Sequence, residues 1–234
     1  MRAAVAFLTA LGGAVPPDRR TLSWFPVVGA LLGLIVGCIW WSADQLWSPF
    51  VAAGLVVAAD LALTGLLHLD GLVDTADGLV PQLPRDRRLA IMSEPTVGAY
   101  GVGAAILVLL LRWSALASMR PNLLLVAGIW CGSRTVMATA ARAVPYARVQ
   151  GGLASALVGG DWRPVGLYGL IGAVSLGAVS AGRQSELAVA IGMLAGAAVV
   201  GVARRRLGGF TGDVLGAAGL LAETVSLVVA AARW

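Results

Sequence analysis

The sequence contains seven apolar stretches, each long enough or nearly long enough to cross the hydrocarbon core of a bilayer. A membrane-spanning helix needs about twenty consecutive, mostly apolar residues. We therefore predict an all-α integral membrane protein, a bundle of about seven transmembrane helices. No internal repeat is evident, and residues 1–234 are expected to form a single polytopic membrane domain. The expected spans lie near residues 25–43, 49–67, 98–119, 121–141, 164–182, 187–203 and 214–232.

The composition excludes an ordinary soluble domain. Hydrophobic residues make up 59% of the chain and charged residues 12%, whereas soluble domains are about a quarter charged. The N-terminus, with Arg2 and a short apolar run, could resemble a signal peptide, but no cleavage site precedes Pro16 and Pro17, so we expect it to be retained. Cys38 and Cys131 each lie inside an apolar run, which favours two buried thiols over a disulfide or a metal site.

The net charge of +5 comes from arginine alone, since lysine is absent. A basic chain could bind nucleic acid, but the placement of these arginines indicates a lipid bilayer instead, and no nucleic acid is expected. With the N-terminus inside and the C-terminus outside, twelve arginines fall on the inside, which is typical of the bacterial cytoplasmic membrane. The inside arginines are Arg2, Arg19, Arg20, Arg85, Arg87, Arg88, Arg142, Arg148, Arg163, Arg204, Arg205 and Arg206, and the outside ones are Arg120, Arg183 and Arg233.

The most polar inside segment is HLDGLVDTADGL, residues 68–79. Asp70, Asp74 and Asp77 are spaced i, i+4 and i+7, so a helical turn would place three carboxylates on one face. A divalent cation would relieve their repulsion, and an all-oxygen donor set favours Mg²⁺. Gly71 and Gly78 would permit close approach of a phosphate-bearing ligand. The alternative is a solvated acidic loop at a helix end.

The roles of other polar residues in and near this segment stay open. His68, the single histidine, could be a general base, a phosphate contact or an interfacial cap. Arg85, Arg87 and Arg88 could bind phosphate oxygens or serve as anchors on the inside face.

A second polar segment, LGGFTGDVLGAA, covers residues 207–218 and leads into the last span. Its glycines could form a backbone nest for phosphate or allow close helix packing, and packing is the favoured interpretation. Asp213 could complete a metal site or cap the final helix.

Four charged residues lie within the expected spans: Asp60, Arg112, Arg134 and Glu223. Such charges are costly unless they pair or line a polar cavity. We expect Asp60 or Glu223 to pair with Arg134, and substrate contact is the alternative.

These motifs together resemble the cobalamin synthase family, the adenosylcobinamide-GDP ribazoletransferases. SWFPVVGALLG at residues 23–33, the acidic segment, RRLAIM followed by GAYG, the Arg134 region, Tyr146-Ala147-Arg148 with Gly151, and GGFTGDVLGAA occur in the order typical of that family. One departure concerns residues 93–97, where the family often has an Asp and an Arg. Here Glu94 keeps the negative charge, but Thr96 cannot replace an arginine.

The resemblance implies a Mg²⁺-dependent reaction in which a ribose hydroxyl of α-ribazole, or of its 5′-phosphate, attacks the cobinamide-linked phosphorus of adenosylcobinamide-GDP and releases GMP. The active site would face the cytoplasm, where other enzymes of the cobamide pathway are potential partners. Under this resemblance the metal ligands would be Asp70, Asp74, Asp77 and Asp213, and the catalytic residues Asp74, Asp77 and His68. The substrate-binding residues would be Arg85, Arg87, Arg88, Arg134, Arg148, Gly208, Gly209 and Thr211.

Three rival classes carry related features. CDP-alcohol phosphotransferases also hold metal with clustered aspartates, but their motif is longer and has an Ala-Arg pair that is missing here. Membrane prenyltransferases carry two acidic motifs, whereas the second segment here offers only Asp213. A transporter would place its polar residues near the bilayer midplane and show repeated halves.

Overall fold

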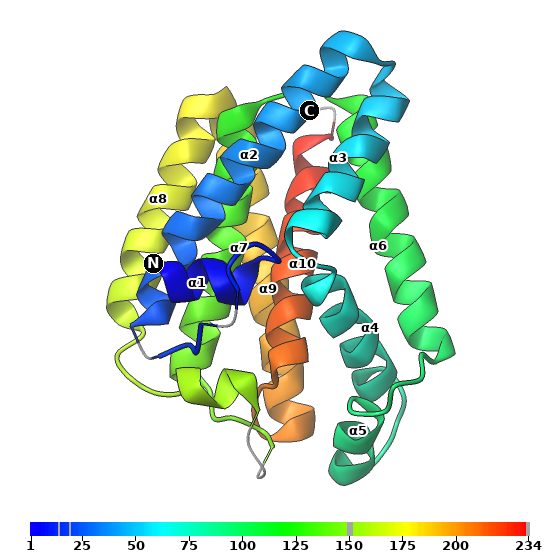
Figure 1. The fold of residues 1–234 in the computed structure, drawn as a ribbon, viewed down its shortest axis with the longest axis vertical. Coiled ribbons are helices and arrows are strands. Elements are labelled where there is room, and N and C mark those ends of the chain that lie inside the picture. Colours follow the sequence, from blue (N-terminus) through cyan, green and yellow to red (C-terminus); the bar gives the residue numbers. More distant parts are fainter. Residues whose placement is uncertain (14, 19, 149–151, 233–234) are drawn as a thin grey trace.

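The chain folds into a bundle of helices, as Figure 1 shows for the computed structural model, which describes residues 1–13, 15–18, 20–148 and 152–232. Within these ranges the structure has no strand, only an isolated bridge between Tyr146 and Phe210, and the all-α prediction is confirmed. The α-helices are α1 (Arg2–Leu8), α2 (Phe25–Leu46), α3 (Pro49–Leu63), α4 (Leu67–Leu79), α5 (Arg85–Ile91), α6 (Ala99–Ser118), α7 (Leu123–Ala143), α8 (Arg163–Ala181), α9 (Arg183–Leu207) and α10 (Gly212–Ala230). Two short 3₁₀ helices, η1 (Thr21–Trp24) and η2 (Leu153–Leu157), lie in the connections.

Helix α7 is the centre of the bundle. It packs against α2, α8, α9 and α10, and α10 in turn packs against α4 and α6. Glycines bring these helices together: Gly29 and Gly33 of α2 lie against the backbone of α7 at Trp130 and Val126. Close contact through small residues is how helices associate where lipid removes the hydrophobic driving force.

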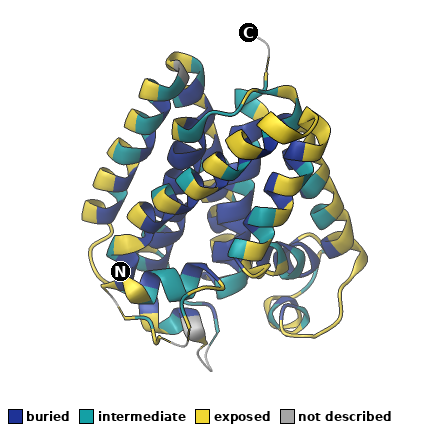
Figure 2. Ribbon diagram, turned by 45° about the horizontal axis from the view of Figure 1, so that its top comes forward, coloured by how far each residue is buried: buried dark blue, intermediate teal, exposed yellow. Residues whose placement is uncertain are grey.

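The outer surface of the bundle is apolar. Exposed positions run along the outside of the helices in Figure 2, and many of them are large hydrophobic residues. Exposed tryptophans also lie near both ends of the bundle. Trp24, the last residue of η1, and Trp41, in the C-terminal part of α2, are about 26 Å apart by helical rise. This is close to the thickness of a hydrocarbon core, and interfacial tryptophans are typical of membrane proteins. The apolar outer surface therefore indicates that lipid surrounds this protein.

Five helices among the described residues are long and apolar enough to cross a membrane: α2 extended by η1, α6, α7, α9 and α10. The bent pair α3 and α4 makes a sixth if it counts as one span. The expected span at residues 164–182 coincides with α8, but the total of seven spans and the orientation of the termini stay predictions.

The predicted span at residues 49–67 is too long at its C-terminal end. Helix α3 ends at Leu63, and the chain turns by 88° into α4. Gly65 and Leu66 both have positive φ, +58° and +62°, and the conformation of Leu66 is rare for a residue with a side chain. The acidic segment expected in an inside loop is therefore helix α4 itself, which confirms the helical spacing of its aspartates.

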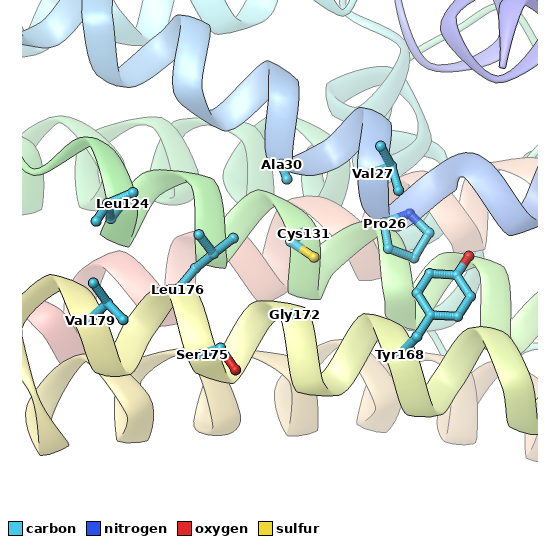
Figure 3. Close-up of a pocket in the computed structure, with 10 residues that line it drawn as sticks. All are labelled: Pro26, Val27, Ala30, Leu124, Cys131, Tyr168, Gly172, Ser175, Leu176 and Val179. Carbon is cyan, nitrogen blue, oxygen red and sulfur yellow. The ribbon is translucent and has the colours of Figure 1, made fainter.

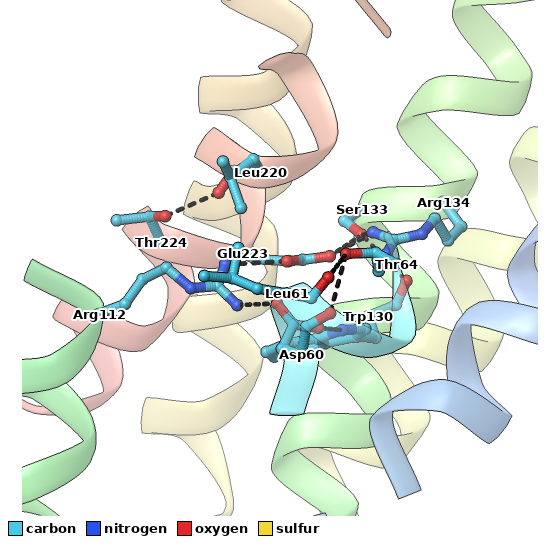
Figure 4. Close-up of polar contacts among 10 residues, drawn as sticks. All are labelled: Asp60, Leu61, Thr64, Arg112, Trp130, Ser133, Arg134, Leu220, Glu223 and Thr224. Carbon is cyan, nitrogen blue, oxygen red and sulfur yellow. Dashed lines mark hydrogen bonds and ion pairs between the residues drawn. The ribbon is translucent and has the colours of Figure 1, made fainter. Parts of the chain in front are cut away.

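A buried ion network joins four helices at the centre of the bundle (Figure 4). Arg112 of α6 donates to Asp60 of α3 at 2.6 Å and to Glu223 of α10 at 2.9 Å. Trp130 of α7 donates its indole N–H to Asp60 at 3.0 Å. Arg134 of α7 also pairs with Glu223. The positive charges of the two guanidinium groups balance the negative charges of the two carboxylates. Such pairing is how charged side chains are tolerated inside a bundle of membrane helices.

The expected pairing of Glu223 with Arg134 is confirmed, but the prediction did not give Arg112 its central place. The reason is that residues 60, 112, 134 and 223 lie at the same level along the axis of the bundle. Their spacing in the sequence does not reveal how the helices are aligned with one another.

Candidate active site

Helices α4 and α10 touch through two glycines. A Cβ atom placed on Gly71 would lie 2.7 Å from the carbonyl oxygen of Asp213, and one placed on Gly216 would lie 3.3 Å from the Cα atom of His68. The two polar segments of the sequence are thus held side by side. The expectation that Gly71 makes room for a ligand is wrong, because the neighbour is the α10 backbone. A Cβ atom placed on Gly78 would likewise collide with a neighbour, the side chain of Met92.

A cavity of about 860 Å³ opens beside this contact. Its polar lining includes His68 and Asp70 of α4, Asp213 of α10, and Tyr146 and Arg148 from the connection after α7. Eight further lining residues come from the N-terminal segment between Ala6 and Pro17. The volume is within the range of pockets that hold small-molecule ligands.

Asp74 is the carboxylate of the site with the most charged groups around it. It interacts electrostatically with Asp213, Asp70 and Asp77, and only Arg148 opposes them with positive charge. Among the described residues, however, no three His, Cys, Asp or Glu side chains lie close enough to hold a metal ion unaided. Mg²⁺ commonly uses only one or two carboxylates together with water and substrate phosphates. Asp74 and Asp213, which interact electrostatically, would supply two carboxylates for a site of that kind.

Asp77 differs from the other two aspartates of α4. It is buried, and its two oxygens accept hydrogen bonds from the backbone amides of Gly98 at 2.7 Å and Gly101 at 2.9 Å. These amides belong to the start of α6, which has unpaired N–H groups and a positive dipole end. The structure thus uses this carboxylate to cap α6, and the predicted role of Asp77 as a catalytic residue and metal ligand stays a prediction.

Asp213 is not the cap of α10. Thr211, which is fully buried, holds that position, and its Oγ1 accepts the amide of Val214 at 3.3 Å. Thr211 Oγ1 also donates to Oδ2 of Asp213 at 3.1 Å, and Arg148 donates to the same oxygen at 2.9 Å. The carboxylate of Asp213 thereby lines the cavity. Thr211 caps α10, and its predicted substrate contact stays a prediction.

Residues 145–147 pair with Phe210 along a short stretch of backbone. Phe210 N donates to Pro145 O at 2.9 Å, and Ala147 N donates to Phe210 O at 2.8 Å. Gly209 leaves no room for a side chain against Pro145, and Gly208, with φ +78°, ends α9. Close packing, the favoured interpretation, thus holds for Gly209, and the predicted role of both glycines in substrate binding stays a prediction.

This backbone pairing also positions Tyr146. Its ring stacks edge-on against Phe210, with centroids 5.4 Å apart. Burial raises the pKa of the Tyr146 hydroxyl, and Asp213 adds to that effect while Arg148 opposes it. The hydroxyl therefore stays protonated at neutral pH and can donate a hydrogen bond into the cavity. In the sequence Tyr146 is recognisable only as part of a motif, and Gly151 of that motif lies outside the described residues.

The three arginines of α5 serve the scaffold. Arg88 is buried and donates to the carbonyls of Gly78 and Leu79 at the end of α4, at 2.8 and 2.9 Å; burial lowers its pKa, and Arg206 adds to this. Arg85 bridges the carbonyls of Leu207 and Ala147, both at 2.7 Å.

Arg87 forms a surface ion pair with Glu94 at 3.2 Å. Arg85 and Arg88 hold helix ends together, as cations near helix C-termini do. The substrate binding predicted for Arg85, Arg87 and Arg88 stays a prediction.

Arg148 alone among the predicted substrate-binding arginines lines the cavity. Arg134 is fully buried, and its NH1 group donates to Glu223 and Ser133. This is the structural pairing expected as the alternative, and substrate contact by Arg134 stays a prediction. His68 remains a candidate: it lines the cavity, and its Nε2 atom has no hydrogen-bond partner among the described residues.

A second hollow, of about 480 Å³, lies between α2, α7 and α8 (Figure 3). Its lining includes Val27, Leu124, Leu176 and Val179, and no charged residue belongs to it. Phosphate-bearing substrates need charged partners, so this groove is unsuited to them.

The fold and the cavity together define a polytopic membrane protein with an acidic and arginine-bearing pocket near one end of its bundle. The family described as cobalamin-5-phosphate synthase matches residues 1–231, and the chain belongs to that family. It is therefore a membrane transferase, and this membership decides against the CDP-alcohol, prenyltransferase and transporter alternatives.

Three relatives illustrate the similarity, and each is named adenosylcobinamide-GDP ribazoletransferase. The protein of Chlorobium phaeovibrioides is 36% identical over 87% of this chain and 84% of its own length. That of Bradyrhizobium diazoefficiens is 37% identical over 99% and 93%, and that of Pseudomonas paraeruginosa is 38% identical over 97% and 96%. No solved structure matches this chain.

Proposed function

We propose that this protein joins adenosylcobinamide-GDP to α-ribazole, or to α-ribazole 5′-phosphate, at the cytoplasmic face of the membrane. The observation that carries the proposal is the cavity between α4 and α10, where Asp70, Asp213 and Arg148 meet. The names of the relatives supply the substrates, and the chemistry of the cavity suits them, since phosphoryl transfer depends on positioning and charge neutralisation.

In the proposed reaction a ribose hydroxyl oxygen forms a bond to the cobinamide-linked phosphorus. The bond from that phosphorus to the bridging oxygen of the diphosphate breaks, and GMP leaves with the electron pair. The hydroxyl proton must pass to a nearby acceptor. His68 is suited to this role because it lines the cavity with a free ring nitrogen, and Asp70 is the second candidate.

Bound Mg²⁺ would neutralise the diphosphate charge, with Asp74 and Asp213 as its protein ligands and Asp70 beside them. Arg148 would contact phosphate oxygens through its guanidinium group while keeping Asp213 in place at 2.9 Å. Tyr146 supplies an uncharged donor on the same side.

The arginine distribution supports the cytoplasmic location. Helix α5 and the end of α9 lie at the lower end of the bundle in Figure 1, and the C-terminus lies at the opposite end. Arginine-rich ends remain on the cytoplasmic side during insertion, and both substrates are polar metabolites.

Purified protein in lipid, incubated with adenosylcobinamide-GDP, α-ribazole and Mg²⁺, should produce the joined cobamide and an equal amount of GMP. Reactions that lack either substrate are the controls. GMP released at the same rate without α-ribazole would indicate hydrolysis and would contradict the proposal.

A further inference from the structure

The cavity has two walls of opposite chemistry. One wall carries the charged and hydrogen-bonding groups of His68, Asp70, Tyr146, Arg148 and Asp213. The other comes from the N-terminal segment and is mostly apolar, with the side chains of Phe7, Val15, Pro16 and Pro17 among its members. A ligand that fills this space therefore meets both charged and apolar groups.

The apolar wall is held in place by the rest of the chain. Ala4 and Leu8 of α1 are fully buried, and the ring of Phe7 packs against that of Phe25 with centroids 5.6 Å apart. Ala10 donates its amide to the carbonyl of Leu63 at 2.9 Å, at the break between α3 and α4. The segment is therefore a fixed part of the cavity.

Asp18 and Thr21 close the far end of this segment. The amide and the hydroxyl of Thr21 both donate to Asp18 Oδ1, each at 2.8 Å, and Asp18 N donates back to Thr21 Oγ1 at 2.9 Å. These hydrogen bonds, above all that of the Thr21 side chain, lower the pKa of Asp18. These contacts join Asp18 to the first residue of η1.

The next step rests on the proposed function. The chemistry of its reactants indicates which of them contacts the apolar wall. The diphosphate and the ribose are polar, and guanine has a hydrogen-bonding edge that an apolar surface would leave unpaired. The benzimidazole base of α-ribazole is flat and apolar. The corrin macrocycle with its amide arms is larger than the ligands that a cavity of about 860 Å³ encloses.

We propose that the N-terminal segment binds the base of the α-ribazole substrate, and that Phe7 and Val15 determine the preference for an apolar base. With the base against this wall, the attached ribose points toward Asp70 and Asp213, where the hydroxyl must react. The segment is then a specificity element of the transferase.

The experiment compares two acceptors, the α-riboside of dimethylbenzimidazole and the α-riboside of adenine, by their kcat/KM values. Val15→Thr replaces a methyl group by a hydroxyl at nearly constant volume, so folding should be preserved. We expect it to lower the preference for the apolar base by about tenfold, the order of one lost apolar contact in a binding pocket. Phe7→Ala should act in the same direction, and Phe7→Leu should retain most of the preference.

Leu11→Asn is the matched control. Leu11 belongs to the same segment but is 70% exposed and does not line the cavity, so its substitution should leave the ratio of the two kcat/KM values unchanged. An unchanged ratio in both Val15→Thr and Phe7→Ala would overturn this inference. An unsubstituted protein that joins neither riboside would instead overturn the proposed function, and this inference with it.

Discussion

Gly71 of α4 lies so close to Asp213 of α10 that any side chain at position 71 would collide with the α10 backbone, 2.7 Å from the Asp213 carbonyl oxygen. This contact joins the two polar segments of the sequence into one site. It also means that the distance between the carboxylates depends on a residue that carries no functional group.

Gly71→Ala should therefore separate α4 from α10 and reduce turnover by more than about tenfold, while overpacking lowers the free energy of unfolding by about 1–3 kcal/mol. Gly103→Ala is the control, because open space surrounds Gly103 on α6 and alanine favours a helix. Thermal unfolding and turnover in lipid measure both effects. Equal activity of Gly71→Ala and the parent would show that the contact does not position the site.

Asp213→Asn tests the ligand role separately from helix capping. Because Thr211 caps α10, the asparagine variant should keep its melting temperature but lose about a hundredfold in turnover, as expected when a charged contact to a transferring phosphate is removed. Thr211→Ala should show the reverse, a loss of about 1 kcal/mol in stability with a smaller change in rate. Normal turnover of Asp213→Asn would remove this residue from the chemistry.

Asp74 and Asp77 should respond differently to the same substitution. Activity should disappear in excess chelator and return with Mg²⁺, and Asp74→Asn should raise the Mg²⁺ concentration required by about tenfold or more while the fold persists. Asp77→Asn should chiefly lower the melting temperature, since an amide offers one acceptor oxygen where the carboxylate accepts two amides. Full turnover in chelator would exclude the metal.

Removal of Arg112 should strongly destabilise the protein. Arg112→Met would leave Asp60 and Glu223 buried with less positive charge between them, and breaking a buried pair in this way costs about 3–5 kcal/mol. Arg87→Met, which removes only a surface pair with Glu94, should cost about 1 kcal/mol or less. Thermal unfolding of both variants measures the two losses in stability. Similar stabilities of Arg112→Met and Arg87→Met would contradict the assigned role of the network.

The orientation of the bundle can be measured with single cysteines in a Cys38→Ser background. An impermeant maleimide applied to intact cells should label Arg183→Cys and should not label Asp86→Cys or Arg205→Cys. After permeabilisation all three should react. Labelling at positions 86 and 205 in intact cells would place the candidate site on the outer face.

Local patterns in the sequence predict the helices and part of the site. Apolar length locates the spans, and the spacing of Asp70 and Asp74 predicts their shared helical face, because both depend on residues near one another in the chain. The role of Asp77 could not be found in this way, since it requires the start of α6, which begins more than twenty residues later.

Other features depend on tertiary structure alone. The break at Leu66 carries no proline and uses a conformation that leucine seldom adopts. The N-terminal wall of the cavity consists of ordinary apolar residues such as Phe7 and Val15, and nothing in their local pattern distinguishes a cavity wall from a membrane anchor. The arginines of α5 show the converse: their charge suggests phosphate, whereas Arg85 and Arg88 contact backbone carbonyls.

The ion network also bears on how the protein is made. Its members enter the nascent chain in the order Asp60, Arg112, Arg134 and Glu223, on four different helices. Until α10 has been synthesised, two guanidinium groups share a single carboxylate, and an excess positive charge within the membrane is unfavourable. Arrival of Glu223 neutralises that excess and ties α6 and α7 to the last helix. The charges of the network therefore balance only when α10 is present, and a chain truncated before α10 would keep an uncompensated positive charge among its buried helices.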